Sequence, residues 1–237
     1  MSMYDFRSQV AIVTGAAGNL GLTVARLFHE AGARLALVDI SLDRLRSEPW
    51  QDAQDVGLFK ADLTDVDQVN RLVEQIRKQF QKIDILANIA GGFRMGPHVH
   101  ETPVDDWNFM LDMNAKSAFL MCRAVVPHML EGGKGKIVNV AARAALEGKA
   151  KMAPYCVSKA AVITLTQSLS AECREKNINV NCILPGTIDT PQNRADMPAS
   201  DFSKWVPTEQ LANEILHLCS KQAVGVTGAA VPVYGKS

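Results

Sequence analysis

The chain has 237 residues, 47% of them hydrophobic and 21% charged, which is the balance of a globular protein with a sizeable core. Its 25 basic and 25 acidic side chains give a formal net charge of zero, so no overall field attracts nucleic acid or an anionic membrane surface. No apolar run reaches the ~18 residues of a membrane span, and the first residues lack the profile of a signal peptide. The composition predicts a cytoplasmic protein with neither nucleic acid nor membrane as a partner.

Seven short apolar runs bounded by turn residues predict strands, at Val10–Val13, Leu35–Asp39, Gly57–Phe59, Ile83–Asn88, Lys136–Val140, Val180–Leu184 and Ala230–Val233. Amphipathic stretches between them predict helices after Gly21, after an N-cap at Thr64, and over Asp106–Leu130, Ala153–Lys176 and Thr208–Ser220. Continuously apolar strands suit a parallel sheet that is covered on both faces. The alternation predicts an α/β fold, in which residues 1–237 form a single domain with a doubly wound parallel β-sheet of about seven strands, the Rossmann fold.

The cysteines and histidines show no pattern of a disulfide framework or a metal site. The five cysteines lack CxxC spacing and lie mostly in apolar surroundings, which predicts reduced, buried thiols. The pair His98 and His100 has no companion acid or thiol at a ligand spacing. We therefore expect no metal.

A glycine-rich turn follows the first strand and runs directly into a helix: Thr14-Gly15-Ala16-Ala17-Gly18-Asn19-Leu20-Gly21. Glycines let the backbone turn tightly and approach a pyrophosphate, which lies against free N–H groups at the helix N-terminus. The second strand ends at Asp39, whose carboxylate can accept hydrogen bonds from an adenosine ribose and repel a 2′-phosphate. No Arg or Lys occupies the turn or the positions beside Asp39. The pattern predicts a dinucleotide site that prefers NAD(H) to NADP(H). The alternative is that Asp39 only caps the end of the strand.

Tyr155 and Lys159 stand four residues apart on a predicted helix, so the phenol and the ammonium share one face. A phenol ionises near pKa ~10, and a nearby cation favours the phenolate, which would bring the pKa of Tyr155 towards working pH. Such a tyrosine can act as a general acid towards a carbonyl or imine, or as a base in the reverse direction. A solitary Tyr-x-x-x-Lys is more often an exposed helix face, but its place after the fifth strand favours a catalytic pair.

In their order along the chain these motifs resemble the short-chain dehydrogenase/reductase family, and the resemblance covers almost all residues. The glycine motif matches at Thr14, Gly15 and Gly21, while Asn19 stands where the family usually has glycine. Asn tolerates left-handed backbone better than other non-glycine residues, so we expect the turn to be kept. The resemblance implies further cofactor contacts at Asp62, Leu63, Asn88, Ala90, Gly91, Pro185, Ile188 and Thr190. It also implies that Lys159 binds the nicotinamide ribose and forms a proton relay with Asn114.

One position departs from the family's catalytic pattern. The family's sites have a serine thirteen positions before the tyrosine, to polarise the substrate oxygen, and that position here carries Ala142. Alanine can neither donate nor accept a hydrogen bond, and losing such a donor costs a factor of about 100 to 1000 when charge develops on oxygen. Either the substrate does not need the donor, or the protein is not an efficient ordinary ketone reductase.

The C-terminal half is similar to the dihydropteridine reductase branch, which lacks the serine and reduces a quinonoid pterin with NADH. The similarity rests on Ala141-Ala142-Arg143-Ala144-Ala145-Leu146-Glu147-Gly148, on Asp189-Thr190-Pro191-Gln192-Asn193-Arg194, and on Phe202 and Trp205. A conjugated ring that is protonated on nitrogen needs an oxyanion donor less. Apolar and aromatic side chains in the expected substrate loops suit a flat ring, namely Phe93, Met152, Met197, Phe202 and Trp205. For Phe202 and Trp205, packing of the loop onto the domain is an equal alternative.

Together these features predict an NAD(H)-dependent oxidoreductase that transfers hydride between nicotinamide and a small carbonyl/alcohol or quinonoid dihydropterin-like substrate, with Tyr155 as acid/base. The alternative is a dinucleotide-binding sensor or scaffold that lost efficient catalysis together with the serine. The resemblance also implies a homodimer or homotetramer, because the helices around Met110–Leu130 and Ala160–Cys173 carry apolar side chains that a partner subunit could cover.

Overall fold

The computed structural model describes residues 3–48 and 53–236. At its centre lies a seven-stranded parallel sheet with the strand order β3-β2-β1-β4-β5-β6-β9. The strands are β1 (Val10–Thr14), β2 (Arg34–Asp39), β3 (Val56–Lys60), β4 (Ile85–Asn88), β5 (Gly135–Val140), β6 (Ile178–Pro185) and β9 (Ala230–Val233). All seven predicted strands are present with ends shifted by at most two residues, and the prediction of a doubly wound α/β fold is confirmed.

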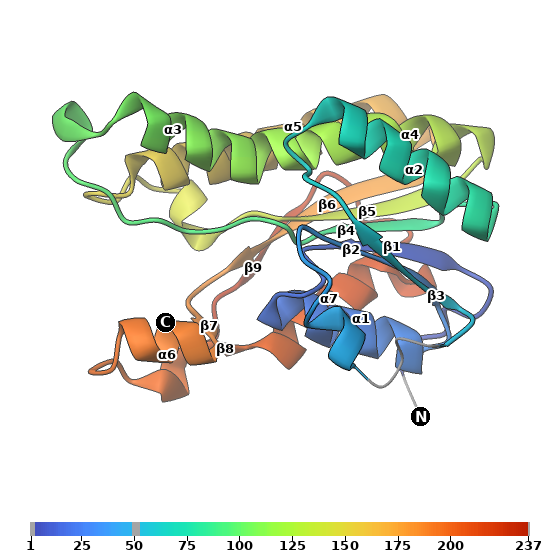
Figure 1. Cartoon of the computed structure of the whole chain (residues 1–237), viewed down its shortest axis with the longest axis horizontal. Coiled ribbons are helices and arrows are strands. Elements are labelled where there is room, and N and C mark those ends of the chain that lie inside the picture. Colours follow the sequence, from blue (N-terminus) through green and yellow to red (C-terminus); the bar gives the residue numbers. More distant parts are fainter. Residues whose placement is uncertain (1–2, 49–52, 237) are drawn as a thin grey trace.

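Helices cover both faces of this sheet, as Figure 1 shows. One face carries α1 (Asn19–Glu30) and α7 (Thr208–Cys219), and the other carries α2 (Val66–Phe80), α4 (Ser117–Glu131) and α5 (Ala153–Cys173). Alternate strand residues therefore enter two separate cores: Val13 packs in the α1 and α7 layer, whereas Ile12 packs in the α2 and α4 layer. Both side chains are fully buried, which explains why the strands read as continuous apolar runs.

The long helix predicted over Asp106–Leu130 is interrupted in the structure. It consists of α3 (Val104–Leu111), one π-helical turn (Asp112–Lys116) and α4. The turn contains Asn114, whose side chain forms two hydrogen bonds with the backbone of Gly92. A widened turn of this kind is common at functional sites and leaves no mark in the apolar periodicity of the sequence.

Two other helix ends differ from their predictions. The N-cap of α2 is Asp65, not Thr64, because the Asp65 carboxylate accepts hydrogen bonds from the backbone N–H groups of Asp67 and Gln68 at 2.9 and 3.0 Å. The Thr64 hydroxyl instead donates to Asp62. Helix α5 ends at Cys173 and continues only as a 3-10 turn, Arg174–Lys176.

A small lobe lies at the carboxyl edge of the sheet, beyond β6 (Figure 1). It contains the two-residue strands β7 (Ile188–Asp189) and β8 (Val206–Pro207), which pair in parallel, and the short helix α6 (Pro191–Asp196). Strands of two residues have no periodicity to read, so the sequence did not predict them.

All five cysteines are free and buried, as predicted. Within residues 3–48 and 53–236 no group of three or more His, Cys, Asp or Glu side chains could hold a metal ion. In the same part of the chain, no helix has the length and apolar content needed to cross a membrane.

Candidate active site

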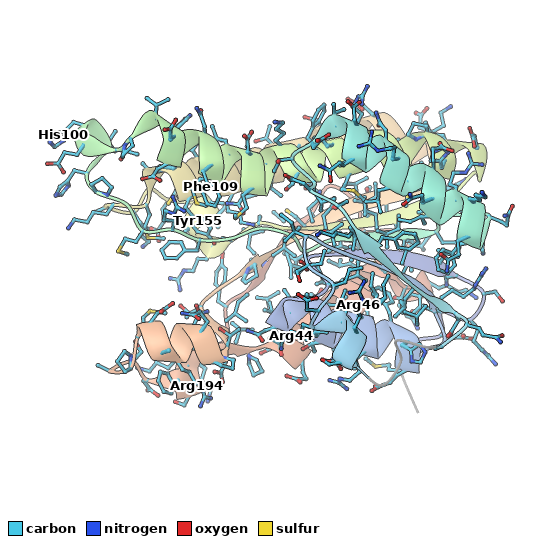
Figure 2. All side chains as sticks on the ribbon, viewed as in Figure 1. Arg44, Arg46, His100, Phe109, Tyr155 and Arg194 are labelled. Atoms are coloured by element: carbon cyan, nitrogen blue, oxygen red, sulfur yellow. The ribbon has the colours of Figure 1, made fainter. Side chains whose placement is uncertain are left out.

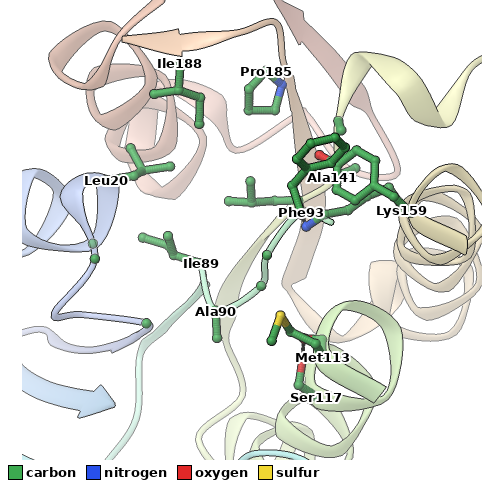
Figure 3. Close-up of a pocket in the computed structure, with 18 of the residues that line it drawn as sticks. Leu20, Ile89, Ala90, Phe93, Met113, Ser117, Ala141, Lys159, Pro185 and Ile188 are labelled. Carbon is green, nitrogen blue, oxygen red and sulfur yellow. Dashed lines mark hydrogen bonds between the residues drawn. The ribbon is translucent and has the colours of Figure 1, made fainter. Parts of the chain in front are cut away.

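The carboxyl ends of the central strands open into a cavity of about 1330 Å³. The chain reverses its direction of winding between β1 and β4, and such a switch point leaves a crevice beyond the strand ends. Figure 3 shows Leu20 and Lys159 on opposite sides of this cavity, with Ile89 and Ala90 between them. The predicted site residues that line the cavity are Gly15, Gly18, Asn19, Leu20, Gly21, Asp39, Asp62, Leu63, Ala90, Gly91, Ala142, Tyr155, Lys159, Pro185, Ile188 and Thr190.

The glycine turn has the geometry of a phosphate cradle. Gly15 has a φ of 62°, in the left-handed region that favours glycine. A Cβ on Gly21 would collide with the carbonyl of Gly15 and lie 2.8 Å from the Cα of Ala16. Gly18, the N-cap of α1, supplies no side-chain hydrogen bond, so the first N–H groups of the helix remain available to an anion. These residues fit the pyrophosphate of a dinucleotide.

Asp39 binds the glycine turn from the end of β2. Its Oδ2 accepts from the backbone N–H of Ala17 at 2.9 Å, and its Oδ1 accepts from Ile40 at 2.8 Å. Asp39 is therefore a strand-end cap, but a carboxylate has about four lone-pair sites and can also accept bonds from ribose hydroxyls. Beside it, Ile40 lines the cavity with 64% of its surface exposed, so an apolar side chain lies next to Asp39 at this end of the cavity.

A basic residue that the sequence analysis missed also reaches this turn. Arg44 donates through Nη1 to the carbonyl oxygen of Ala17 and through Nη2 to Oδ1 of Asn19, both at 3.0 Å. The sequence shows no Arg or Lys in the turn or next to Asp39, but the chain folds back after β2 and brings this guanidinium there. An arginine a few residues past a strand-end acid is the one signal that could have indicated it.

Tyr155 and Lys159 lie in the first two turns of α5 and line the same cavity. Lys159 is only 5% exposed, and its Nζ donates to the carbonyl oxygen of Val140 at 2.8 Å. Burial lowers the pKa of Lys159 to about 8. Burial, and next the thiol of Cys156, raise the pKa of Tyr155 to about 12.

The direction of the Tyr155 shift is the opposite of the one predicted from sequence. We expected Lys159 to lower the pKa of Tyr155, but removal of the phenol from water is the larger effect and disfavours the phenolate. The phenol is consequently protonated at neutral pH, which is the form that a general acid needs.

Two of the predicted site residues, both asparagines, lie behind the cavity wall. Asn114 accepts from the N–H of Gly92 at 2.9 Å and donates to Oγ of Ser158 at 3.0 Å, so it ties the end of β4 to α5. Asn88 is 4% exposed and donates to Oδ1 of Asn139 at 2.9 Å within the sheet. Neither side chain lines the cavity, and their contacts position neighbouring elements.

The substrate end of the cavity is largely apolar. Phe93, Met113, Met152 and Met197 line it together with Ala142. The rings of Phe93 and Tyr155 pack edge to face, with their centroids 4.9 Å apart. This wall would surround any substrate that reaches the Tyr155 hydroxyl.

Other candidates for the substrate wall pack elsewhere. The rings of Phe202 and Trp205 pack against each other with their centroids 4.7 Å apart, and neither residue lines the cavity. This arrangement favours the alternative in which the two side chains pack the lobe onto the domain. Arg194 stacks over Phe202 and forms an ion pair with Asp189 at 2.6 Å.

The fold and the site define a class: a Rossmann-fold domain whose cavity joins a dinucleotide-type glycine turn to a tyrosine and a lysine. Residues 9–200 match the family model described as short chain dehydrogenase. The chain belongs to the short-chain dehydrogenase/reductase family, and it is an oxidoreductase.

Known proteins resemble the chain over nearly its whole length. It is 34% identical to an NAD-dependent glycerol dehydrogenase of Listeria innocua, over 98% of this chain and 94% of that protein. It is 36% identical to a 2-(R)-hydroxypropyl-CoM dehydrogenase of Xanthobacter autotrophicus, over 96% of this chain and 98% of that protein. The crystal structure of NAD+-bound xylitol dehydrogenase superposes with a TM-score of 0.87 at 28% identity, covering 97% of this chain and 99% of that one.

Proposed function

We propose that the protein is an NAD(H)-dependent dehydrogenase/reductase that interconverts a small alcohol and its carbonyl, with Tyr155 as the general acid or base. The observation that carries this proposal is that the side chains of Tyr155 and Lys159 line one cavity with the glycine turn and Asp39. The names of the relatives agree with it, since they describe a glycerol dehydrogenase that depends on NAD and a xylitol dehydrogenase with NAD+ bound. A bound nicotinamide would supply hydride to the substrate carbon, or accept it.

The protein's own residues then handle the proton. The Tyr155 hydroxyl keeps its proton at neutral pH and can give it to the carbonyl oxygen as negative charge develops there. Lys159 has a pKa of about 8 and is mostly protonated at pH 7. Its ammonium shares a helix face with the phenol and stabilises the phenolate that remains after the transfer.

Ala142 favours a second candidate substrate, a quinonoid dihydropterin. A pterin ring accepts its proton on nitrogen, so it does not need the hydrogen bond that a serine at position 142 would donate. The apolar wall of Phe93, Met113 and Met152 suits a flat ring, and the C-terminal half resembles the dihydropteridine reductase branch. Asp39 supports a preference for NAD(H) over NADP(H) in either case.

Steady-state assays with NADH or NAD+ separate these candidates. Turnover of polyols or simple ketones supports the first, and turnover of quinonoid dihydropterin with no panel ketone supports the second. Tyr155→Phe should lower turnover by a factor of about 100 to 10,000 and leave NADH binding, measured by fluorescence titration, unchanged. Unchanged turnover would contradict the acid role.

The sequence also predicts an alternative, a sensor or scaffold that lost efficient catalysis with the serine, and the family and the named dehydrogenase relatives favour the enzyme over it. A sensor or scaffold would bind NADH tightly, turn over no member of a broad substrate panel, and gain no rate from Ala142→Ser. An increase in kcat on ketones for Ala142→Ser, with Tyr155 present, would identify the protein as an enzyme that lacks one oxyanion donor.

We also propose a homodimer or homotetramer in the cytoplasm. Trp107, Phe119 and Val157 project from α3, α4 and α5 with 37%, 48% and 43% of their surfaces exposed, and a partner subunit would cover such side chains. The zero net charge and the five free cysteines suit a cytoplasmic location. Light scattering after gel filtration measures the assembly, and a monomeric mass would contradict it.

A further inference from the structure

We infer that the substrate is a ketone, or the corresponding secondary alcohol, whose apolar body extends from the Tyr155 hydroxyl to the mouth of the cavity. This rests on the dehydrogenase function proposed above and names the substrate class for that same site. An alkyl or aryl ketone fits this site better than a polyol does.

An apolar wall runs from the buried part of the cavity to its mouth. The buried part includes Ala141 and Ala142. The outer part consists of four large apolar side chains that line the cavity with 38% to 60% of their surfaces exposed: Phe93, Met95, Phe109 and Met197. Exposed apolar side chains at a cavity mark surface that a ligand covers on binding. A substrate with a long apolar body would therefore bury more of this wall than a small one.

The ring of Phe109 is held at the mouth by a cation. The guanidinium of Arg94 lies over this ring, 4.3 Å from its centroid, and Arg94 forms an ion pair with Asp106 at 2.5 Å. Phe109 belongs to α3 and Tyr155 to α5, and Figure 2 shows both residues at the same end of the molecule. A held ring presents a fixed apolar surface to a substrate that extends outwards from Tyr155.

Methionine side chains form much of the rest of the wall. Met95, Met113, Met152 and Met197 all line the cavity. The unbranched thioether chain of methionine adapts to apolar surfaces of different shape and makes favourable contacts with aromatic rings. Such a wall suits apolar bodies of several sizes.

Four charged or amide side chains line the cavity next to this wall, and each already has a partner. They are Asn193 with the carbonyl oxygen of Ile188 at 2.8 Å, Lys149 with Glu147 at 2.6 Å, Asp112 with Lys116 at 3.5 Å, and Arg143 over the ring of Tyr234 at 5.0 Å. A polyol would have to compete for these groups. Each hydroxyl that stays unpaired against an apolar wall weakens binding by a factor of about 5 to 100.

Position 142 points to the same substrate class. Ala142 adds a methyl group to the wall where the family usually has a serine hydroxyl. The substrate oxygen then meets the Tyr155 hydroxyl, while Nζ of Lys159 donates to the carbonyl oxygen of Val140. A site built in this way fits a substrate with one polar atom to bind and an apolar remainder.

Steady-state kinetics with NADH and a series of 2-alkanones tests the inference. Each buried methylene group raises kcat/KM by up to about fourfold. We therefore expect kcat/KM to rise about tenfold from butanone to 2-hexanone and about 100-fold from butanone to 2-octanone. Dihydroxyacetone, a polar ketone of similar size to butanone, should have a kcat/KM about tenfold or more below that of butanone.

Two variants test the outer wall through the ratio of kcat/KM for 2-octanone to that for butanone. Phe109→Ala should lower this ratio about fivefold or more, because the longer ketone reaches the mouth. Met95→Ser changes an exposed side chain outside any helix, so it spares the fold, and it should lower the ratio about threefold. Val104→Ala is the matched control: it also lies on α3, is exposed and does not line the cavity, and it should leave the ratio unchanged.

Several results would overturn the inference and leave the proposed function intact. One is a ratio near one in the wild-type protein, and another is faster oxidation of glycerol or xylitol than of 2-octanol with NAD+. Turnover of quinonoid dihydropterin but of no alkanone would assign the wall to a flat ring. An unchanged ratio in both Phe109→Ala and Met95→Ser would show that the substrate does not reach the mouth. If the protein binds NADH and turns over no ketone, polyol or pterin, the proposed function fails as well.

Discussion

Lys159 is a buried ammonium group, and its burial has a cost in stability that can be measured. Its pKa of about 8 in the folded protein lies below the ordinary value of 10.5. Between these two values the unfolded chain binds more protons than the folded chain, so the free energy of unfolding rises with pH. Below pH 8 the penalty is fully present, and at ~1.4 kcal/mol per pKa unit it amounts to about 3 kcal/mol. At pH 9.5 about 1.4 kcal/mol of it remains, so raising the pH from 7 to 9.5 should stabilise the protein by about 2 kcal/mol through this group.

The substitution Lys159→Met removes the charge and keeps an unbranched side chain of similar length. It also removes the hydrogen bond to the carbonyl oxygen of Val140, a loss of about 1.5–3 kcal/mol that offsets much of the gain at pH 7. The discriminating quantity is therefore the pH dependence. The difference in unfolding free energy between the two proteins should change by about 2 kcal/mol from pH 7 to pH 9.5, because other titrating groups are common to both.

Urea unfolding followed by circular dichroism at pH 7 and pH 9.5 gives this difference directly. Lys78→Met, on the exposed side of α2, is the matched control and should follow the wild-type protein at both pH values. If Lys159→Met also follows the wild-type protein in parallel, the pKa of Lys159 is not lowered in the folded state. That result would refute the argument that burial makes this lysine a weak base in the cavity.

Three further substitutions test the glycine turn, a helix cap and a buried carboxylate. Gly21→Ala places a Cβ against the carbonyl of Gly15 and should weaken NADH binding more than about tenfold by calorimetry; unchanged affinity would mean that the turn adapts. Asp65→Ala removes the N-cap of α2 and should lower the free energy of unfolding in urea by about 1 kcal/mol; an unchanged value would mean that water replaces the cap. Asp84→Ala removes a 6% exposed carboxylate that accepts from the N–H of Val10 at 2.9 Å, so thermal unfolding should show a loss of about 2–4 kcal/mol, and a loss below about 1 kcal/mol would contradict this.

The local pattern of the sequence determined the sheet, the glycine turn and the shared face of Tyr155 and Lys159. Continuously apolar runs predict strands that are buried on both faces. A spacing of four residues predicts two side chains on one side of a helix. Each of these features depends on residues that are neighbours in the chain. The strands were therefore predicted to within two residues, and the tyrosine and the lysine do line one cavity.

Contacts between distant residues were decided only by the tertiary structure. Asn114 bonds to Gly92, 22 residues away, and Arg44 bonds to Asn19, 25 residues away, and no local pattern predicts either pair. The π-helical turn contains Asn114, and Arg44 reaches the glycine turn only because the chain folds back after β2.

The charge states of the tyrosine and the lysine were decided in the same way. The sequence shows that a cation stands near a phenol, and this alone predicts a lowered pKa for Tyr155. Packing removes both groups from water, and desolvation disfavours the charged form of each, so the pKa of the phenol rises and that of the ammonium falls. Desolvation depends on every atom that surrounds a group, which is why the sequence determined the identity and shared face of the pair and only the fold decided its protonation.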